Sequence, residues 1–379
     1  MKKVIIFTCI GGHNTISASL KEQLGQQYNI RVMNIFLDII RWFDPIRILS
    51  FGFQNAETYY GFLIRNRMTR FLNKTFKPSL KVFNLLHYFI HKKIKNAIIK
   101  ERPKCIISVI PWFNDHFVAI AKELNIPFFL MPTDIELSHF FYNIEKISYE
   151  KFYFLIPIYD MYVYDYAIAK GVLPNQIILS GVALKSSFFV SHDQYAVRSR
   201  FSIPQAKPVV LLLMGSQGST SIIDYVKMLA KIKNLSFHLI IVLGANATLR
   251  QKVRHIQFEP LITCSIFDFT PFIPQLMSIA TVLITKSGGI SISEALYMDL
   301  PMFLDATSEV IFWEQKNQDF VEKNEFGSII HSLKDVPQLL VNVLQKENNS
   351  SNIYKNNMQF FEKKNGSDTV RELLDKVIE

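Results

Sequence analysis

The sequence contains few of the residues that crosslink a chain or break its secondary structure. It has 3 cysteines among 379 residues, and its 14 glycines and 15 prolines are unexceptional. Cys9, Cys105 and Cys264 lie far apart without metal-ligand spacing, which argues against a disulfide scaffold. No Asp-x-Asp pair occurs, and we expect no metal ion. The uncharged run 269–285 has 17 residues and two prolines, too short for the roughly 20 apolar residues of a membrane-spanning helix.

The composition is that of a folded protein with more than one core. Hydrophobic residues make up 49% of the chain and charged residues 20%, which excludes a disordered chain. A chain of this length is expected to form about two to three domains. The net charge of +10 has no meaning until it is located along the chain.

The positive charge is concentrated in residues 41–100. This window holds twelve basic residues against Asp44 and Glu57, together with twelve aromatic residues. From residue 186 onward, 19 basic residues balance 19 acidic ones. The pattern predicts a cationic, aromatic surface in the N-terminal half, which suits either an anionic membrane or nucleic acid. The window contains no recognisable nucleic-acid-binding module, so we expect no nucleic-acid partner.

Short apolar runs alternate with amphipathic stretches, which predicts an α/β protein with parallel strands. The pattern breaks near residues 188–207 and restarts at Val209, so we expect two Rossmann-like, doubly wound domains that face each other across a cleft. The predicted parts are residues 1–187, a linker at 188–207, a second domain at 208–350 and a C-terminal helix at 351–379 that packs back on the first domain. The predicted strands are Lys3–Cys9, Cys105–Ile110, Pro127–Met131, Gln176–Leu179, Val209–Met214, Phe237–Leu243, Leu261–Ser265, Val282–Thr285 and Met302–Leu304. An amphipathic helix is predicted over 80–100.

The strongest motif runs from Ile284 to Leu296. A predicted strand enters the turn Ser287-Gly288-Gly289 and continues directly into a helix. Glycines let the backbone approach an anion, and the first free N–H groups of a helix favour phosphate oxygens. Glu294 lies about one turn into the helix, where its carboxylate could bind a ribose diol. A strand–turn–helix with serine caps is the structural alternative.

Weaker motifs follow other strands. The turn at Gly215-Ser216-Gln217 is a second candidate phosphate loop. Gly11-Gly12-His13 opens the first predicted helix, where a neutral imidazole could accept a proton. Thr133, Asp134 and His139 follow a buried strand, where we expect acid–base groups on the cleft rim or a helix cap. Polar residues at 314–317 could hydrogen-bond a sugar.

Together these motifs resemble the GT-B glycosyltransferases of the monogalactosyldiacylglycerol synthase and processive diacylglycerol glucosyltransferase group, relatives of the lipid II-forming N-acetylglucosaminyltransferase. The resemblance rests on Gly11-Gly12-His13, Thr133-Asp134, Lys170-Gly171-Val172, Ser180-Gly181-Val182 and 286–301, the last segment being the most specific. Ile10, Ala183, Lys185 and Trp313 depart from the family pattern.

The resemblance implies inverting, metal-independent transfer of a hexose from a UDP-sugar, used as a substrate and not as a cofactor, to a lipid hydroxyl such as that of diacylglycerol. It implies a first domain for the acceptor and the membrane, and a second for the UDP-sugar. It also implies a cytoplasmic protein peripherally bound to the inner membrane face. His13 or Asp134 would be the catalytic base. The implied donor-site residues are Gly215, Ser216, Gln217, Phe272, Ile273, Ser287, Gly288, Gly289, Ser291, Glu294, Glu314 and Asn317.

Two alternatives share the predicted fold. A non-hydrolysing UDP-N-acetylglucosamine 2-epimerase also carries a Ser-Gly-Gly helix start, but it needs no lipid-facing surface. A non-catalytic GT-B binding protein would not need His13, Asp134, Glu294 and Glu314, all of which are present.

Overall fold

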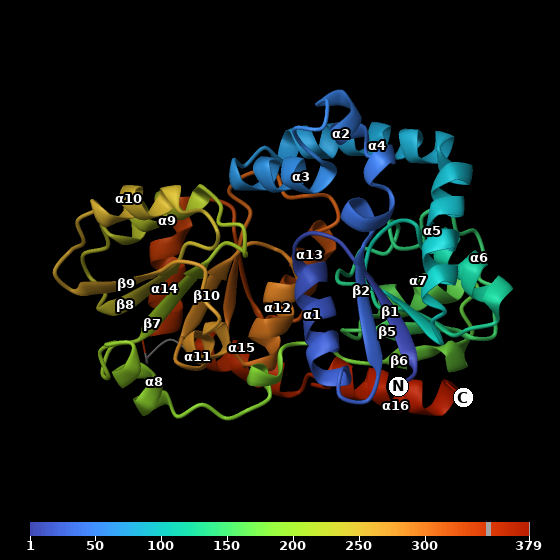
Figure 1. The fold of residues 1–379 in the computed structure, drawn as a ribbon. Helices are drawn as coiled ribbons and strands as arrows, with labels where there is room; N and C mark the ends of the chain where they lie inside the picture. The colour runs from blue at the N-terminus through green and yellow to red at the C-terminus, as the bar shows by residue number, and fades with distance from the viewer. Residues whose placement is uncertain (346–349, 379) are drawn as a thin grey trace. The chain divides into compact units, whose positions relative to one another are not determined.

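The computed structural model describes residues 1–345 and 350–378, apart from the side chains of residues 76–79. The chain forms two compact units (Figure 1). The first contains residues Met1–Gly61, Asn73–Ser186 and Lys363–Glu379, and the second contains Phe62–Leu72 and Ser187–Glu362. Each unit is built on a six-stranded sheet of parallel strands.

The sheet of the first unit has the strand order β2-β1-β3-β4-β5-β6. Its interior strands are almost completely buried, because helices cover a doubly wound sheet on both faces. The strands are β1 (Lys3–Thr8), β2 (Asn29–Asn34), β3 (Cys105–Ser108), β4 (Phe128–Leu130), β5 (Phe152–Ile156) and β6 (Ile177–Leu179).

The sheet of the second unit has the order β12-β11-β10-β7-β8-β9. β7 and β8 are fully buried runs of branched and aromatic side chains, as expected of central parallel strands. The strands are β7 (Val209–Leu213), β8 (Phe237–Val242), β9 (Ile262–Phe267), β10 (Val282–Thr285), β11 (Met302–Asp305) and β12 (Gly327–Ile330). The predicted fold class, an α/β protein with two doubly wound sheets, is confirmed.

Helices connect successive strands in both units. In the first unit and the segment that leaves it, they are α1 (Gly12–Leu24), α2 (Pro45–Leu49), α3 (Ala56–Arg65), α4 (Thr69–Leu85), α5 (His87–Glu101), α6 (Asn114–Leu124), α7 (Met161–Ala169) and α16 (Gly366–Val377). In the second unit they are α8 (Gln194–Arg200), α9 (Ser221–Leu229), α10 (Thr248–Arg254), α11 (Ile273–Ser278), α12 (Gly289–Tyr297), α13 (Gln315–Lys323), α14 (Val336–Leu344) and α15 (Ser350–Gln359).

Several helices differ from the predicted pattern. The single helix expected over 80–100 is two helices, because α4 ends at Leu85 and α5 begins at His87. The C-terminal segment 351–379 also contains two helices: α15 lies in the second unit, whereas α16 lies in the first and packs on α1. Within the described residues, no helix combines the length and apolar character needed to cross a bilayer.

The two units also differ from the predicted division of the chain in one N-terminal segment. Residues Phe62–Leu72, from the end of α3 to the start of α4, belong to the second unit although they lie far from it in the sequence. The backbone N–H of Thr220 donates to the carbonyl oxygen of Arg65 at 3.0 Å, and Thr69 Oγ1 donates to the carbonyl oxygen of Glu309 at 2.5 Å. The predicted domain 208–350 also includes residues 346–349, which lie outside the described part of the chain.

Candidate functional site

The sheet of the second unit has a topological switch point between β7 and β10. These two strands pair side by side, while the later strands β8 and β9 extend in one direction and β11 and β12 in the other. The loops that leave the carboxyl ends of β7 and β10 therefore diverge, which leaves a crevice where ligands bind in doubly wound folds. Both glycine motifs predicted to bind phosphate begin at this point.

The loop after β7 needs its glycines. Gly215 has φ +76° and Gly218 has φ +71°, backbone conformations that glycine adopts without strain. A Cβ at Gly218 would lie 2.0 Å from the carbonyl oxygen of Leu243, and one at Gly215 would lie 3.0 Å from Lys286 Cε. The loop is thus packed closely against the loops that follow β8 and β10. Ser216 is exposed and Gln217 half-buried in this turn.

Two side chains of α13 hydrogen-bond to the loop after β10. Ser287 is 1% exposed, its carbonyl oxygen accepts a hydrogen bond from Asn317 Nδ2 at 2.9 Å, and its hydroxyl accepts one from Gln318 Nε2 at 2.5 Å. Asn317 is itself 1% exposed, so it holds this loop in place, unlike the sugar-facing position expected for it. Among the described side chains, none caps α12 at Gly288, and the helix starts with an uncapped first turn.

Lys286 and Glu314 form an ion pair beside the same loop. Lys286 Nζ lies 2.9 Å from Glu314 Oε1, and the Glu314 side chain is 8% exposed against 30% for Lys286. A Cβ at Gly288 would approach both side chains, at 3.3 Å from Lys286 Nζ and 3.5 Å from Glu314 Oε1. The ion pair therefore lies directly beside the glycine turn, with the Lys286 ammonium group close to the start of α12.

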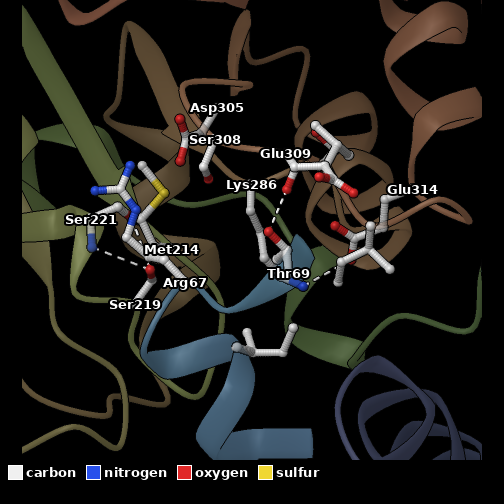
Figure 2. A pocket seen from close by; sticks show the side chains of 14 residues that line it. Arg67, Thr69, Met214, Ser219, Ser221, Lys286, Asp305, Ser308, Glu309 and Glu314 are labelled. Atoms are coloured by element: carbon white, nitrogen blue, oxygen red, sulfur yellow. Dashed lines mark hydrogen bonds and ion pairs between the residues drawn. The ribbon is translucent and has the colours of Figure 1, made fainter. Parts of the chain in front are cut away.

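A pocket opens over this region within the second unit (Figure 2). Lys286, Ser287 and Glu314 line it together with Ser219 and with Arg67 from the segment Phe62–Leu72. Figure 2 shows the side chains of Arg67 and Lys286 in the same pocket, although they come from positions more than two hundred residues apart in the chain. Besides the cations Arg67 and Lys286, three carboxylates line the pocket, those of Asp305, Glu309 and Glu314. Ser287, which directly precedes Gly288 at the start of α12, places the pocket beside a helix N-terminus, where an anionic group is favoured.

Arg67 is held firmly in this pocket. Its Nη1 lies 2.6 Å from Asp224 Oδ2 on α9, and its Nη2 donates to Thr307 Oγ1 at 3.2 Å. Thr307 in turn donates to Asp305 Oδ1, which also accepts the Tyr225 hydroxyl at 2.9 Å. Burial and the neighbouring Asp305 raise the pKa of Tyr225 above its usual range, so its hydroxyl remains a donor. Sequence patterns gave no signal for Arg67, because its place depends on tertiary contacts.

The remaining candidate donor-site residues follow β10 and the edge strand β9, and they do not line the pocket. Gly289, Ser291 and Glu294 belong to α12, with Gly289 buried and the other two half-buried. Phe272 and Ile273 are half-buried at the start of α11. The Arg200 guanidinium carbon lies 4.5 Å from the centroid of the Phe272 ring and covers one of its faces.

In the first unit, His13 follows β1 at the matching switch point, since β1 pairs with both β2 and β3. Gly11 adopts φ +84° just before α1, which sets the direction in which the helix begins. His13 Nδ1 lies 2.6 Å from the carbonyl oxygen of Val109. Because a carbonyl oxygen only accepts, Nδ1 carries the proton and Nε2 carries the lone pair. The half-buried imidazole is thus oriented as a proton acceptor through Nε2.

Thr133 connects Asp134 with His13, because its hydroxyl lies within reach of both side chains. Thr133 Oγ1 donates to Asp134 Oδ2 at 2.9 Å and lies 3.4 Å from His13 Nδ1. His139 differs from its expected place on a cleft rim, since it is only 4% exposed. Burial, with a smaller contribution from His13, lowers the pKa of His139 to about 3, so this imidazole is neutral and structural. The structure therefore brings His13 and Asp134 together and leaves His139 in the core.

The C-terminal half matches a known family of domains. Residues 209–373 match the model of the glycosyltransferase family 28 C-terminal domain, which covers all six strands of the second sheet. MurG from Acinetobacter baumannii has the same fold over 99% of this chain and 100% of its own, with a TM-score of 0.60 and 12% identity. The UDP-GlcNAc 2-epimerase of Neisseria meningitidis has an equal TM-score of 0.60 at 13% identity, over 99% of this chain and 100% of its own. The second unit is therefore similar to a glycosyltransferase family 28 C-terminal domain, and the whole chain has the GT-B fold that MurG and the epimerase share.

The proteins that are similar in sequence belong to a narrower group than the proteins that are similar in fold. The processive diacylglycerol beta-glucosyltransferase of Staphylococcus carnosus (strain TM300) is 24% identical over 352 residues, which cover 92% of this chain and 86% of the relative. The predicted resemblance to the processive diacylglycerol glucosyltransferase group is confirmed by this match along nearly the whole chain.

Proposed function

We propose that the protein transfers a hexose from a UDP-sugar to a lipid hydroxyl, with inversion at the anomeric carbon and without a metal ion, at a membrane surface. The observation that carries this proposal is the pocket of the second unit, where Lys286, Ser287 and Arg67 meet at the switch point. The names of the relatives support glucose as the sugar and diacylglycerol as the acceptor.

The second unit would hold the donor. The uncapped start of α12 and the cations Lys286 and Arg67 would bind the diphosphate, and they would stabilise the negative charge that develops on the leaving UDP. Glu294, on the second turn of α12, would bind the ribose, and Phe272 with Ile273 would lie by the uracil. Glu314, which lines the pocket, would face the sugar.

The first unit would activate the acceptor. His13 Nε2 would remove the proton from the acceptor hydroxyl as the oxygen attacks the anomeric carbon, opposite the departing UDP. The resulting imidazolium would keep its hydrogen bond from Nδ1 to the Val109 carbonyl oxygen, which stabilises the charged form. Asp134 would add a negative charge near the same imidazole.

The protein would bind the acceptor at the anionic, cytoplasmic face of a membrane. Between residues 42 and 53 the first unit exposes large apolar side chains: Trp42 (72%), Ile48 (58%), Leu49 (77%), Phe51 (92%) and Phe53 (90%). Arg41 and Arg47 lie 5.9 and 5.7 Å from the Trp42 ring centroid, so cations flank the apolar group. Apolar insertion combined with positive charge is typical of peripheral membrane binding.

The experiment that tests this proposal supplies the purified protein with UDP-glucose, UDP-galactose or UDP-N-acetylglucosamine. Vesicles contain diacylglycerol and an anionic lipid, and matched vesicles lack diacylglycerol. We expect UDP release that depends on diacylglycerol and one donor, with the glycolipid identified by mass spectrometry.

Two other outcomes would overturn parts of the proposal. UDP binding without a lipid product would retain the donor site and reject diacylglycerol as acceptor. An interconverted UDP-sugar without transfer would instead indicate the epimerase reaction, which the shared fold allows.

A further inference from the structure

Four side chains that commonly bind transition metals meet between α5 and α6 of the first unit. His87 and His91 lie one turn apart on α5, so both face the same neighbour. Asp115 and His116 lie in the first turn of α6. The ligand atoms of His87, Asp115 and His116 all lie within 4.8 Å of one another. None of these residues lines the donor pocket.

The distances within this cluster suit a bound ion. His87 Nε2 lies 3.0 Å from Asp115 Oδ2, and the rings of His87 and His116 have centroids 4.2 Å apart. Ligand atoms around a tetrahedral zinc ion, at about 2.0–2.1 Å from the metal, are separated by roughly 3.4 Å. Small side-chain rotations therefore bring the three atoms to bonding distance.

His91 occupies the place of an orienting partner. Its Nδ1 lies 3.2 Å from His116 Nδ1, a distance at which one imidazole donates to the other. With Nδ1 of His116 engaged there, Nε2 is the nitrogen that remains for a metal. Metal-binding histidines generally have their second nitrogen fixed by a hydrogen bond of this kind.

The cluster lies partly in the interior of the first unit and partly at its surface. His116 is 4% exposed, so the side chains packed around its ring hold it in place. The His87 side chain, by contrast, is 49% exposed, so an ion has a path from solvent.

We propose that His87, Asp115 and His116 form a binding site for Zn²⁺, with His91 as the residue that orients His116. Two imidazoles and one carboxylate are a donor set that suits zinc, with water as the fourth ligand. The ion would fasten α5 to α6, two helices also joined by the ion pair of Lys95 and Glu123 at 2.5 Å. The site is independent of the proposed transferase activity.

The test uses the full-length protein after treatment with a chelator. ZnCl₂ is titrated in competition with a chromophoric chelator, and CoCl₂ is added separately to record the visible absorption of tetrahedral cobalt. We expect one equivalent of Zn²⁺ to bind. His87→Ala and Asp115→Asn each remove a ligand and should weaken the Zn²⁺ affinity at least about tenfold. His91→Ala should weaken the Zn²⁺ affinity by a similar factor, because His116 loses the residue that orients it. His255→Ala, at an exposed histidine of the second unit, is the matched control.

Thermal unfolding gives a second measurement. A ligand that binds only the folded state raises the melting temperature, so ZnCl₂ should stabilise the parent protein and the control but not the variants His87→Ala and Asp115→Asn. The His87 side chain is 49% exposed, and Asn has the same shape as the Asp115 side chain, which is 13% exposed. Without zinc, the melting temperatures of both variants should therefore stay close to that of the parent. Absence of stoichiometric Zn²⁺ binding, or an unchanged Zn²⁺ affinity in both His87→Ala and Asp115→Asn, would overturn the proposal.

Discussion

His13 donates a hydrogen bond from Nδ1 to the carbonyl oxygen of Val109 at 2.6 Å, and this contact fixes which nitrogen can act as a base. Val109 directly follows β3, the strand that pairs with β1. The tautomer is therefore set by the sheet itself, through the loops that leave two neighbouring strands.

Removal of the His13 imidazole should lower kcat and leave donor binding unchanged. We expect His13→Ala to reduce kcat by about 10²–10⁴-fold, the usual contribution of a general base, with the UDP dissociation constant within about twofold of the parent. Asp134→Asn should have a smaller effect on kcat. Initial rates of UDP release and calorimetric titration with UDP measure the two quantities. An active His13→Ala variant beside an inactive Asp134→Asn variant would assign the base to Asp134.

Arg67 should contribute to donor affinity from outside the family 28 domain. A hydrogen bond to a charged group contributes about 1.5–3 kcal/mol, so Arg67→Ala should weaken UDP binding by about 10–100-fold. Arg70→Ala is the matched control. The Arg70 side chain is 77% exposed, and its Nε makes just one long ion pair among the described residues, 3.9 Å from Glu309 Oε2. Calorimetric titration with UDP distinguishes the two variants. Equal affinities would show that Arg67 serves only to dock its own segment.

The exposed apolar side chains at residues 42–53 should carry membrane binding. Phe51→Ser and Phe53→Ser together should weaken binding to anionic vesicles by more than about tenfold, because each buried Phe contributes about 1.5–3 kcal/mol. Phe360→Ser is the matched control, at a side chain that is 90% exposed in the second unit. Vesicle co-sedimentation measures the effect, and equal losses in the control variant would contradict it.

The exposed lysines of α5 should make membrane binding depend on salt. Lys92 and Lys93 are exposed on α5, so Lys92→Ala with Lys93→Ala should reduce vesicle binding at low ionic strength and matter less at high salt. Lys95 is less suitable for this test because it pairs with Glu123. A vesicle affinity that does not change with salt in the parent protein would reject the electrostatic contribution.

Buried His139 should make the first unit sensitive to acid. Its folded pKa is about 3, below the usual value of about 6.5 for the unfolded chain, so the unfolded state binds the proton first as the pH falls. The free energy of unfolding should then decrease by up to about 1.4 kcal/mol per pH unit below pH 6.5. His139→Gln should reduce this slope and His255→Gln should not, as measured by urea denaturation between about pH 7 and pH 5. An unchanged slope in His139→Gln would contradict the prediction.

The sequence patterns predicted nine of the twelve strands in the described part of the chain, including the edge strands β6 and β9, and missed three. The strands β2 and β12 lie at the edges of their sheets, and β2 is half-exposed with Asn29 and Arg31 in it, so neither forms a long apolar run. β5 was also missed, although its five residues are almost fully buried. Edge strands carry weaker patterns because only part of their surface faces the core.

The site was predictable where one local motif contains all its parts. Ser287 and Gly288 follow a strand and begin a helix, and that pattern is visible in thirteen consecutive residues. Glu314 was predicted as one of the polar residues at 314–317 and again from the family resemblance, but its contact with Lys286 spans 28 residues and was not predicted. Arg67 and the cluster around His116 depend on packing between distant segments, which no spacing in the chain encodes.

The segment Phe62–Leu72 makes the second unit discontinuous in the sequence. The polypeptide passes from one unit to the other four times, so cleavage at the single site near residue 187 would not release an intact second unit. A fragment that begins there would retain β7–β12 but lack Arg67 and leave Asp224 without its ion pair. The pocket of the second unit is therefore built from residues on both sides of position 187. An exchange of the second unit between relatives would have to include this short N-terminal segment as well.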